Sequence, residues 1–315
     1  MSTSTAPNTR AVPGVGYLML ASLGLFWGLN WPGMKIALDE VTVWWFRSMS
    51  VSAGGIGLLA IAALQGERVL PHRAEIGPLL ICTVFSILGW HLCTGYGVSL
   101  MPAGRASIIA FTMPVWAAIL AVWILGERMN AYRVIGLGLG VAGLAVLIGP
   151  GLMVFTDAPL GALFMLGAAL SWAVGTVLIK RFDWRSPVTV LVGWQLSLGA
   201  VVITIGAAWL EPLPDPRAWS SDAIWALAYL FALPMIYCQW AYFYVVRIMP
   251  AATAAFGTLA VPVVGVFSSA ILLGEPVGWP EYAALVLICA ALAVVLVLPN
   301  LRRTRSAQVS GVSSE

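Results

Sequence analysis

The amino-acid sequence predicts an all-α integral membrane protein, with ten transmembrane helices arranged as two inverted five-helix repeats. Three observations support this fold class: an apolar composition, ten stretches long enough to cross a bilayer, and an internal repeat. Of the 315 residues, 61% are hydrophobic and 9% are charged, and the mean hydropathy is +0.94. Soluble domains carry about 25% charged residues, so this composition places the chain in a lipid bilayer.

The second observation is the spacing of the apolar stretches. A helix needs about 20 apolar residues to cross the hydrocarbon core of a membrane. Five candidate spans precede residue 150 and five follow residue 160. In chain order, the expected spans are 17–37, 43–64, 76–99, 104–125, 132–149, 161–181, 188–210, 223–246, 252–273 and 280–298.

The third observation is an ungapped internal repeat. Residues 101–127 align with residues 249–275 at a shift of 148, and 9 of the 27 aligned positions are identical, including Pro114 and Pro262. That is more identity than shared apolar composition should produce. A fixed period marks a duplicated structural unit whose apolar faces pack against the other copy.

The number of spans in each copy determines how the two copies are oriented. Because five crossings end on the opposite side from where they begin, the second copy must insert upside down relative to the first. Inverted repeats occur in many secondary transporters, whose substrate site lies between the repeats near the bilayer midplane. The expected organisation is an N-terminal tail (1–15), a first repeat (16–150), a second repeat (161–299) and a basic C-terminal tail (300–315).

Lysine and arginine residues gather on one side of this expected topology. Cytoplasmic flanks of membrane spans are enriched in these residues, so we expect both termini in the cytoplasm. Twelve basic residues then lie on the cytoplasmic side and three (Lys35, Arg105 and Arg217) on the other, while Arg47 falls inside the second span. We therefore expect a multi-pass protein of the bacterial inner membrane, with no cleaved leader before the first span.

Several functional classes lack the motifs that they need. The chain has no GxxxxGK[ST] loop, and its longest polar connector, 211–222, is too short for a nucleotide-binding domain, which excludes ATP-driven transport by this chain alone. No HExxH helix, GxSxG elbow or intramembrane Asp pair is present, which argues against an enzyme. No Cys/His ligand spacing indicates a metal site. We expect no metal, no cofactor and no nucleic-acid partner.

Few strongly polar side chains fall inside the expected spans, where such groups are costly and usually functional. His91 and Gln239 are equivalent at the shift of 148, and Thr94 and Tyr242 follow them by three residues, which places each pair on one helix face. Asn30 is the polar residue of the first span. We expect these side chains to bind a polar solute in a central cavity. The alternative is that they hydrogen-bond between helices as structural contacts.

Aromatic residues also lie deep in the spans, and Trp27 and Trp172 are equivalent at a shift of 145. We expect them to wall the same cavity, although packing against lipid or helices is the alternative. An aromatic pocket favours apolar or aromatic solutes, with an indole N–H or a tyrosine hydroxyl available to a carboxylate. The candidates for the apolar walls are Trp27, Trp90, Trp172 and Trp240, and the hydroxyls of Tyr96 and Tyr244 are further candidates for polar contacts.

Three prolines inside the expected spans are expected to bend or break the helix. Pro114 and Pro262 lie near the middle of the fourth and ninth spans, where each removes a backbone hydrogen bond. We expect a matched pair of hinges, and static kinks are the alternative. Pro32 is expected to break the first span. Glu127 and Glu275 end the fourth and ninth spans, and we expect them to form structural hydrogen bonds or ion pairs.

The repeated motif resembles that of the EamA family of the drug/metabolite transporter superfamily. The resemblance covers residues 16–299, and its motifs are Pro102-Ala103, Pro114, Gly126-Glu127, Pro250-Ala251, Pro262, Gly274-Glu275 and Arg47, which Gln195 replaces in the second copy. It implies a ten-helix inner-membrane carrier, often an exporter of metabolites or amino acids. It also implies a cavity lined mainly by the third, fourth, eighth and ninth spans. The aromatic core is most similar to that of bacterial aromatic and neutral amino-acid exporters.

The expected function is export of aromatic or neutral amino acids, or related small metabolites, by alternating access. The expected partners are a small-molecule substrate and the lipid bilayer. The sequence leaves the oligomeric state open, and a monomer is sufficient. The alternatives are a channel or pore for small solutes, an exporter of drugs or other metabolites, and a scaffold that transports nothing. A channel would need rings of charge or a carbonyl-lined filter, and the sequence shows neither.

Overall fold

The computed structural model describes residues 14–126, 129–152, 158–248 and 251–297. The regular structure of these residues is helical, in ten segments that match the ten expected spans. Two short 3₁₀ turns, η1 (Arg73–Glu75) and η3 (Pro216–Ala218), lie in connectors. The segments are α1 (Gly14–Leu38), α2 (Val43–Leu64), α3–η2–α4 (Ile76–Thr83, Val84–Gly89, Trp90–Leu100), α5 and α6 (Ala103–Ala110, Met113–Leu125), α7 (Ala131–Leu152), α8 (Ala158–Arg181), α9 (Val188–Leu210), α10–η4–α11 (Ser221–Leu230, Phe231–Tyr237, Cys238–Ile248), α12 (Ala251–Leu273) and α13–η5 (Trp279–Leu292, Ala293–Val297).

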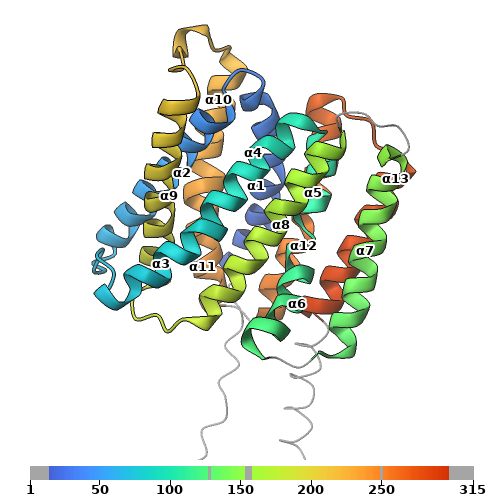
Figure 1. Cartoon of the computed structure of the whole chain (residues 1–315), viewed down its shortest axis with the longest axis horizontal. Helices are drawn as coiled ribbons and strands as arrows, with labels where there is room; N and C mark the ends of the chain where they lie inside the picture. Colours follow the sequence, from blue (N-terminus) through green and yellow to red (C-terminus); the bar gives the residue numbers. More distant parts are fainter. Residues whose placement is uncertain (1–13, 127–128, 153–157, 249–250, 298–315) are drawn as a thin grey trace, which may run out of the picture.

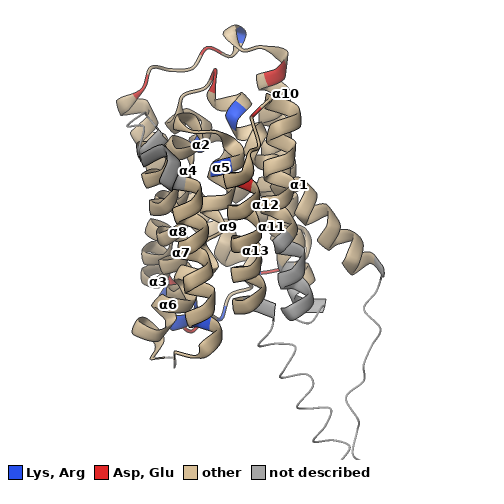
Figure 2. Cartoon of the chain, turned by 90° about the vertical axis from the view of Figure 1, so that its right-hand side faces the viewer, with Lys and Arg blue, Asp and Glu red and all other residues tan. Residues whose placement is uncertain are grey.

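The lengths and the charge distribution of these helices fit a lipid bilayer. Lys, Arg, Asp and Glu lie mainly towards the two ends of the bundle (Figure 2). Three shorter apolar helices lie within α7, α12 and α13–η5. Six helical stretches are long and apolar enough to cross a membrane: Val43–Leu64, Arg73–Leu100, Ala103–Leu125, Leu160–Arg181, Val188–Leu210 and Ser221–Tyr242.

The helices pack in pairs that recur across the bundle. In Figure 1, α2 and α9 lie side by side at one edge, and α7 lies beside α13 at the other. Between these edges, α1 packs against α12 and against α10 and α11, while α8 packs against α4 and η2 and against α5 and α6. Helices from the two halves of the chain therefore alternate within one bundle.

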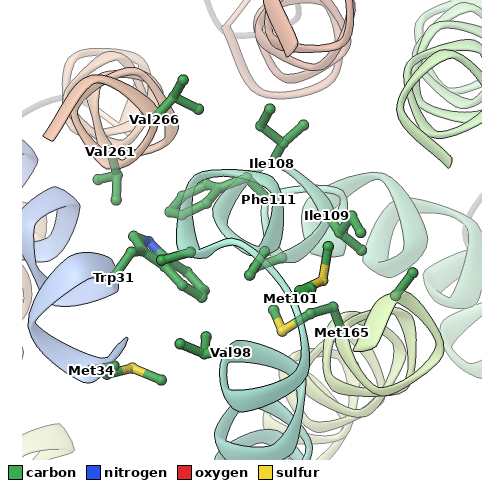
Figure 3. Packing of buried hydrophobic residues seen from close by; sticks show 14 of the residues in the cluster. Trp31, Met34, Val98, Met101, Ile108, Ile109, Phe111, Met165, Val261 and Val266 are labelled. Carbon is green, nitrogen blue, oxygen red and sulfur yellow. The ribbon is translucent and has the colours of Figure 1, made fainter. Parts of the chain in front are cut away.

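The largest buried cluster lies where α1, α4, α5, α8 and α12 meet. Trp31 of α1 packs between Val98 of α4, Phe111 at the end of α5 and Val261 of α12 (Figure 3). Lipid tails are as apolar as these side chains, so close van der Waals packing stabilises the contact more than exclusion of water does. Small residues let the backbones approach. A Cβ at Gly55 of α2, for example, would lie 2.6 Å from the hydroxyl oxygen and 2.9 Å from the backbone nitrogen of one α9 residue, Ser197.

Carboxylates from connectors cap the helices at the α1–α2 end, the end of the bundle that carries the connector between α1 and α2. The first amides of a helix have no partner within it. Glu211 accepts hydrogen bonds from the amides of Trp44 and Trp45 in the first turn of α2, at 3.3 and 3.2 Å. Glu275 accepts from the amides of Ala103 and Gly104 in the first turn of α5, at 2.6 and 2.9 Å. The expected structural hydrogen bonds are confirmed for Glu275, while Glu127 lies outside the described residues.

The opposite end is joined by a carboxylate as well. Glu75, at the end of η1, accepts hydrogen bonds from the backbone nitrogen and the hydroxyl of Ser186, at 3.0 and 2.5 Å. It also accepts one from the backbone nitrogen of Arg185. This single side chain therefore ties the connector before α3 to the connector between α8 and α9.

The prolines behave differently from one another. The expected break at Pro32 is wrong, because α1 runs without interruption from Gly14 to Leu38. A proline removes only one backbone hydrogen bond, and buried neighbours such as Trp31 and Met34 hold the helix on both sides of it. Pro114 lies in the first turn of α6, after a two-residue break that ends α5, whereas Pro262 lies inside the continuous helix α12.

Candidate functional site

A polar cluster joins α1, α2 and α4 inside the bundle. Arg47 of α2 is only 4% exposed, and its Nη2 atom donates to Oγ1 of Thr94 at 2.6 Å and to Sδ of Met34 at 3.6 Å. Nδ2 of Asn30 donates to the same sulfur at 3.2 Å. His91 is buried one helical turn before Thr94, within electrostatic reach of the guanidinium. The structure thus brings Asn30, His91 and Thr94 together around an arginine that the sequence analysis left without a role.

The sequence of α4 explains how a guanidinium fits beside it. A Cβ at Gly95 would lie 2.6 Å from Cγ1 of Val43 and 3.4 Å from Nε of Arg47, so glycine allows α2 to lie close. The Thr94 hydroxyl donates to the carbonyl oxygen of Trp90 at 2.7 Å. Its oxygen is therefore free to accept a hydrogen bond from Arg47.

Arg47 is incompletely neutralised. Its Nε atom is buried without a hydrogen-bond partner, and so is Nδ1 of His91. Among the residues that the structure describes, one salt bridge forms, between Arg105 and Glu281 at 2.6 Å, so no described carboxylate pairs with Arg47. The other polarised contact of its guanidinium is the ring of Phe46, whose centroid lies 4.8 Å away. A buried cation held only by neutral groups is costly in a membrane, which makes Arg47 a candidate functional residue.

The polar residues of the second half lie along α11. Tyr242 packs on Trp27 of α1, with ring centroids 5.5 Å apart and planes at 52°. Gln239 is half-buried and shares no hydrogen bond with His91. Both α4 and α11 contact α1. Helix α1 therefore packs against both helices that carry the polar stripes, which are His91 and Thr94 on α4 and Gln239 and Tyr242 on α11.

Two aromatic pairs connect the two halves of the chain. Trp27 of α1 contacts Tyr242 of α11, and Trp90 of α4 contacts Trp172 of α8, with centroids 4.9 Å apart in the second pair. Trp27 and Trp172 are equivalent in the internal repeat. Each half therefore contributes an aromatic side chain from its first helix to a helix of the other half.

Three further candidates lie apart from the cluster around Arg47. The hydroxyl of Tyr96 accepts a hydrogen bond from Nε1 of Trp44 at 2.9 Å, and its ring stacks on Phe164 at 5.2 Å. Tyr244 is 42% exposed and stacks on Trp240, with centroids 5.5 Å apart. Their observed partners are aromatic residues of neighbouring turns and helices.

Three π-helical segments of the described residues, in which the helical turns are wider than in an α-helix, were not predicted, and two of them precede candidate site residues. The π-helical segments η2 and η4 interrupt α3–α4 and α10–α11 at positions that are equivalent at the shift of 148, and His91 and Gln239 each follow by two residues. Segments of this kind are rare and often occur at functional sites. Pro234 lies in η4, but Ser86 takes its place in η2, so no shared residue signals both turns.

The charged groups of the described residues do not form a metal site. No group of three or more His, Cys, Asp or Glu side chains in the described ranges is placed to hold a metal ion. The cluster around Arg47 consists of neutral hydrogen-bonding groups and one cation, a combination suited to holding a polar or anionic group.

Comparison with known proteins identifies the fold and the family. The uncharacterized transporter YvbV of Bacillus subtilis is 31% identical over 289 residues, which cover 92% of each chain. A probable amino-acid metabolite efflux pump of Salmonella typhimurium is 30% identical and covers 94% of this chain and 98% of its own. A crystal structure at 21% identity has a TM-score of 0.63 over 87% of this chain and 95% of that one, which shows a shared fold. The model of the EamA-like transporter family matches twice, over residues 14–149 and 159–297. The chain therefore belongs to the EamA-like transporter family.

Proposed function

We propose that this transporter exports aromatic or neutral amino acids, or related small metabolites, across the bacterial inner membrane. It does so by alternating access between two inverted five-helix repeats, with both termini in the cytoplasm. The substrate binds beside α1, between the polar stripes of α4 and α11. Bending near Pro114 and Pro262 opens the site to each side of the membrane in turn.

The helix packing supports two inverted repeats. Equivalent helices make equivalent contacts: α1 packs against α10, α11 and α12, and its counterpart α8 packs against α4, α5 and α6. Two further helices pack against their own counterparts, α2 against α9 and α7 against α13, as expected at an axis that exchanges the halves. The family model also matches each half separately.

The observation that carries the proposal is the polar cluster of Asn30, His91 and Thr94 around Arg47, inside an otherwise apolar bundle. Small-molecule sites combine mostly apolar walls with a few placed polar groups. The aromatic pairs formed by Trp27 and by Trp90 supply apolar surface on the adjoining helices. An amino acid with an apolar side chain has both kinds of surface. The name of the Salmonella relative, an amino-acid metabolite efflux pump, points to the same substrate class.

Uptake of labelled phenylalanine and leucine into inverted vesicles tests the proposal. The variants His91→Ala and Gln239→Ala should each lower the initial rate, because each removes a hydrogen-bonding group from the site. Removing a group that binds a polar part of the substrate costs about 1–3 kcal/mol, or roughly 5- to 150-fold. Gln65→Ala, at an exposed position just after α2, is the matched control and should transport normally.

Two results would contradict the proposal. Normal transport by both site variants, as monodisperse proteins, would remove His91 and Gln239 from the site. Flux that is not accelerated by substrate on the far side of a proteoliposome membrane would indicate a channel, because exchange acceleration belongs to a carrier.

A further inference from the structure

Arg47 carries a buried positive charge that no described carboxylate neutralises. Its guanidinium is 4% exposed, donates to one neutral hydroxyl and one thioether, and keeps Nε without a partner. Breaking a buried ion pair by removing one member costs several kcal/mol because the remaining charge is uncompensated. Among the described residues, Arg47 is in this situation, because its charge has no partner of opposite charge. If Arg47 served only to join α2 to α4, a neutral hydrogen-bonding side chain could do so without the cost of a buried charge.

The polar atoms of this cluster that lack a partner are Nε of Arg47, which is a donor, and Nδ1 of His91. Nδ1 of His91 is buried without a partner and donates in the tautomer that carries its proton there. The acceptors beside Arg47 are the Thr94 hydroxyl and the weakly accepting sulfur of Met34. A ligand that complements this cluster must supply acceptor oxygens and negative charge.

A carboxylate has the required chemistry. It offers two oxygens in the plane that a guanidinium recognises through two parallel hydrogen bonds. An amine would be repelled by the positive charge of Arg47. No described carboxylate forms an ion pair at this position that could bind the amine instead. The positions of these residues along their helices fit the same role. Asn30 lies one turn before Met34 in α1, and His91 lies one turn before Thr94 in α4, so both lie deeper in the bundle than the groups that contact the guanidinium. The guanidinium is therefore on the side of the cluster nearer the α1–α2 end.

We infer that Arg47 is the anchor for the carboxylate of the transported solute, with His91 as a supporting donor. The substrates are therefore carboxylates, zwitterionic amino acids among them, and not amines or other cations. This inference rests on the proposed transport function, and it adds the group by which the site selects its substrates.

Counterflow in proteoliposomes tests the inference with three solutes that share one side chain: phenylalanine, phenylalaninamide and phenethylamine. The wild-type protein should exchange the acid and exclude the two compounds that lack a carboxylate. Arg47→Gln should lower exchange of the acid at least about 30-fold, the lower bound for removing one partner of a buried charge pair. Arg47→Lys, which keeps the charge but loses the paired donors, should fall between the two. Arg73→Gln, which removes an exposed arginine in η1, is the matched control and should exchange the acid normally.

Other results would overturn the anchor. Equal exchange of the acid and the amine by the wild-type protein would leave the transport function intact and reject the carboxylate requirement. A normal rate for Arg47→Gln with the acid would also leave the transport function intact, and it would reject Arg47 as the anchor. If Arg47→Gln does not fold, Arg47→Lys decides the matter, since an unreduced rate for the acid would reject recognition by the guanidinium fork.

A binding measurement separates failure of this inference from failure of the transport proposal. If the wild-type protein exchanges none of the three solutes, the exporter proposal fails for this side chain. The anchor is then tested by the thermal unfolding midpoint in phenylacetate and in phenylacetamide. A rise with the acid alone that is lost in Arg47→Lys supports the anchor, and no rise in the wild-type protein rejects it.

Discussion

Replacing Glu275 by alanine should loosen the first turn of α5. The Glu275 carboxylate accepts hydrogen bonds from the amides of Ala103 and Gly104, at 2.6 and 2.9 Å. The residue before the helix, Pro102, provides no side-chain cap. Glu275 follows α12 in the chain, so this cap joins two segments separated by about 170 residues in sequence.

The size of the effect follows from the two hydrogen bonds. Each bond to a charged group contributes about 1.5–3 kcal/mol, and a carboxylate at a helix N-terminus gains from the helix dipole. Glu275 is partly exposed, so water replaces some of the lost bonding in the variant. We expect a net loss of about 2–3 kcal/mol for Glu275→Ala. Glu275→Gln should lose about half as much, because it keeps one acceptor oxygen.

Hydrogen exchange followed by mass spectrometry measures this loss locally. A loss of about 2 kcal/mol speeds exchange of the two amides about 30-fold when they exchange through local opening. Asp39→Asn is the control, since Asp39 is an exposed carboxylate in the connector between α1 and α2 and accepts no hydrogen bond from a described residue. Unchanged protection at Ala103 and Gly104 in Glu275→Ala would refute the capping argument. Equal deprotection in the control would assign the effect to general loss of charge at this end.

Three further predictions concern helix geometry and pH. Pro262→Ala should slow transport more than Pro114→Ala, because of the two prolines only Pro262 lies inside a continuous helix, where its missing hydrogen bond lets the helix bend; initial rates in vesicles check this, and equal effects would contradict it. Gly55→Ala should lower the thermal unfolding midpoint through overpacking of about 1–3 kcal/mol, since a Cβ there would meet the α9 backbone, whereas Gly138→Ala, in open space, should not. Hydrogen bonds donated by the hydroxyl and the amide at the start of α10 lower the pKa of Glu40. Its contribution to stability is therefore full above the ordinary value of about 4.3 and lost as pH falls through the lower folded value, so the midpoint difference between wild type and Glu40→Gln should vanish there.

The helices were predictable because membrane spans are specified by composition over long windows. The apolar runs from Val43 to Leu64 and from Val188 to Leu210 match the expected spans 43–64 and 188–210. The break expected at Pro32 was wrong, because the helix propensity of a residue does not include tertiary packing. Packing of the neighbouring residues keeps α1 helical on both sides of this proline. Pro114 shows the converse: its helix is already interrupted, and the proline takes a position in the first turn where its missing amide is harmless.

The site was only partly visible in the sequence. Asn30, His91 and Thr94 were found because polar residues stand out in apolar spans, and the structure places them in one cluster. Arg47 was recognised as a charge inside the second span and as part of the family motif, but it was not included among the candidate site residues. Tyr96 could not be placed, since its direction depends on Trp44 of another helix.

The π-helical turns before His91 and Gln239 alter how the third and eighth spans must be compared with related chains. A residue added to an α-helix rotates everything after it by about 100°, since 3.6 residues complete a turn. Inserting or deleting one residue inside Val84–Gly89 or Phe231–Tyr237 would therefore change which downstream side chains face inward. An alignment of related chains has to place such a gap correctly before their inward-facing residues can be compared. Two homologues with the same residues after this point, but differing by one residue within it, would present different surfaces to their solutes. Single-residue insertions and deletions at these two places are thus a route by which specificity can diverge without any substitution.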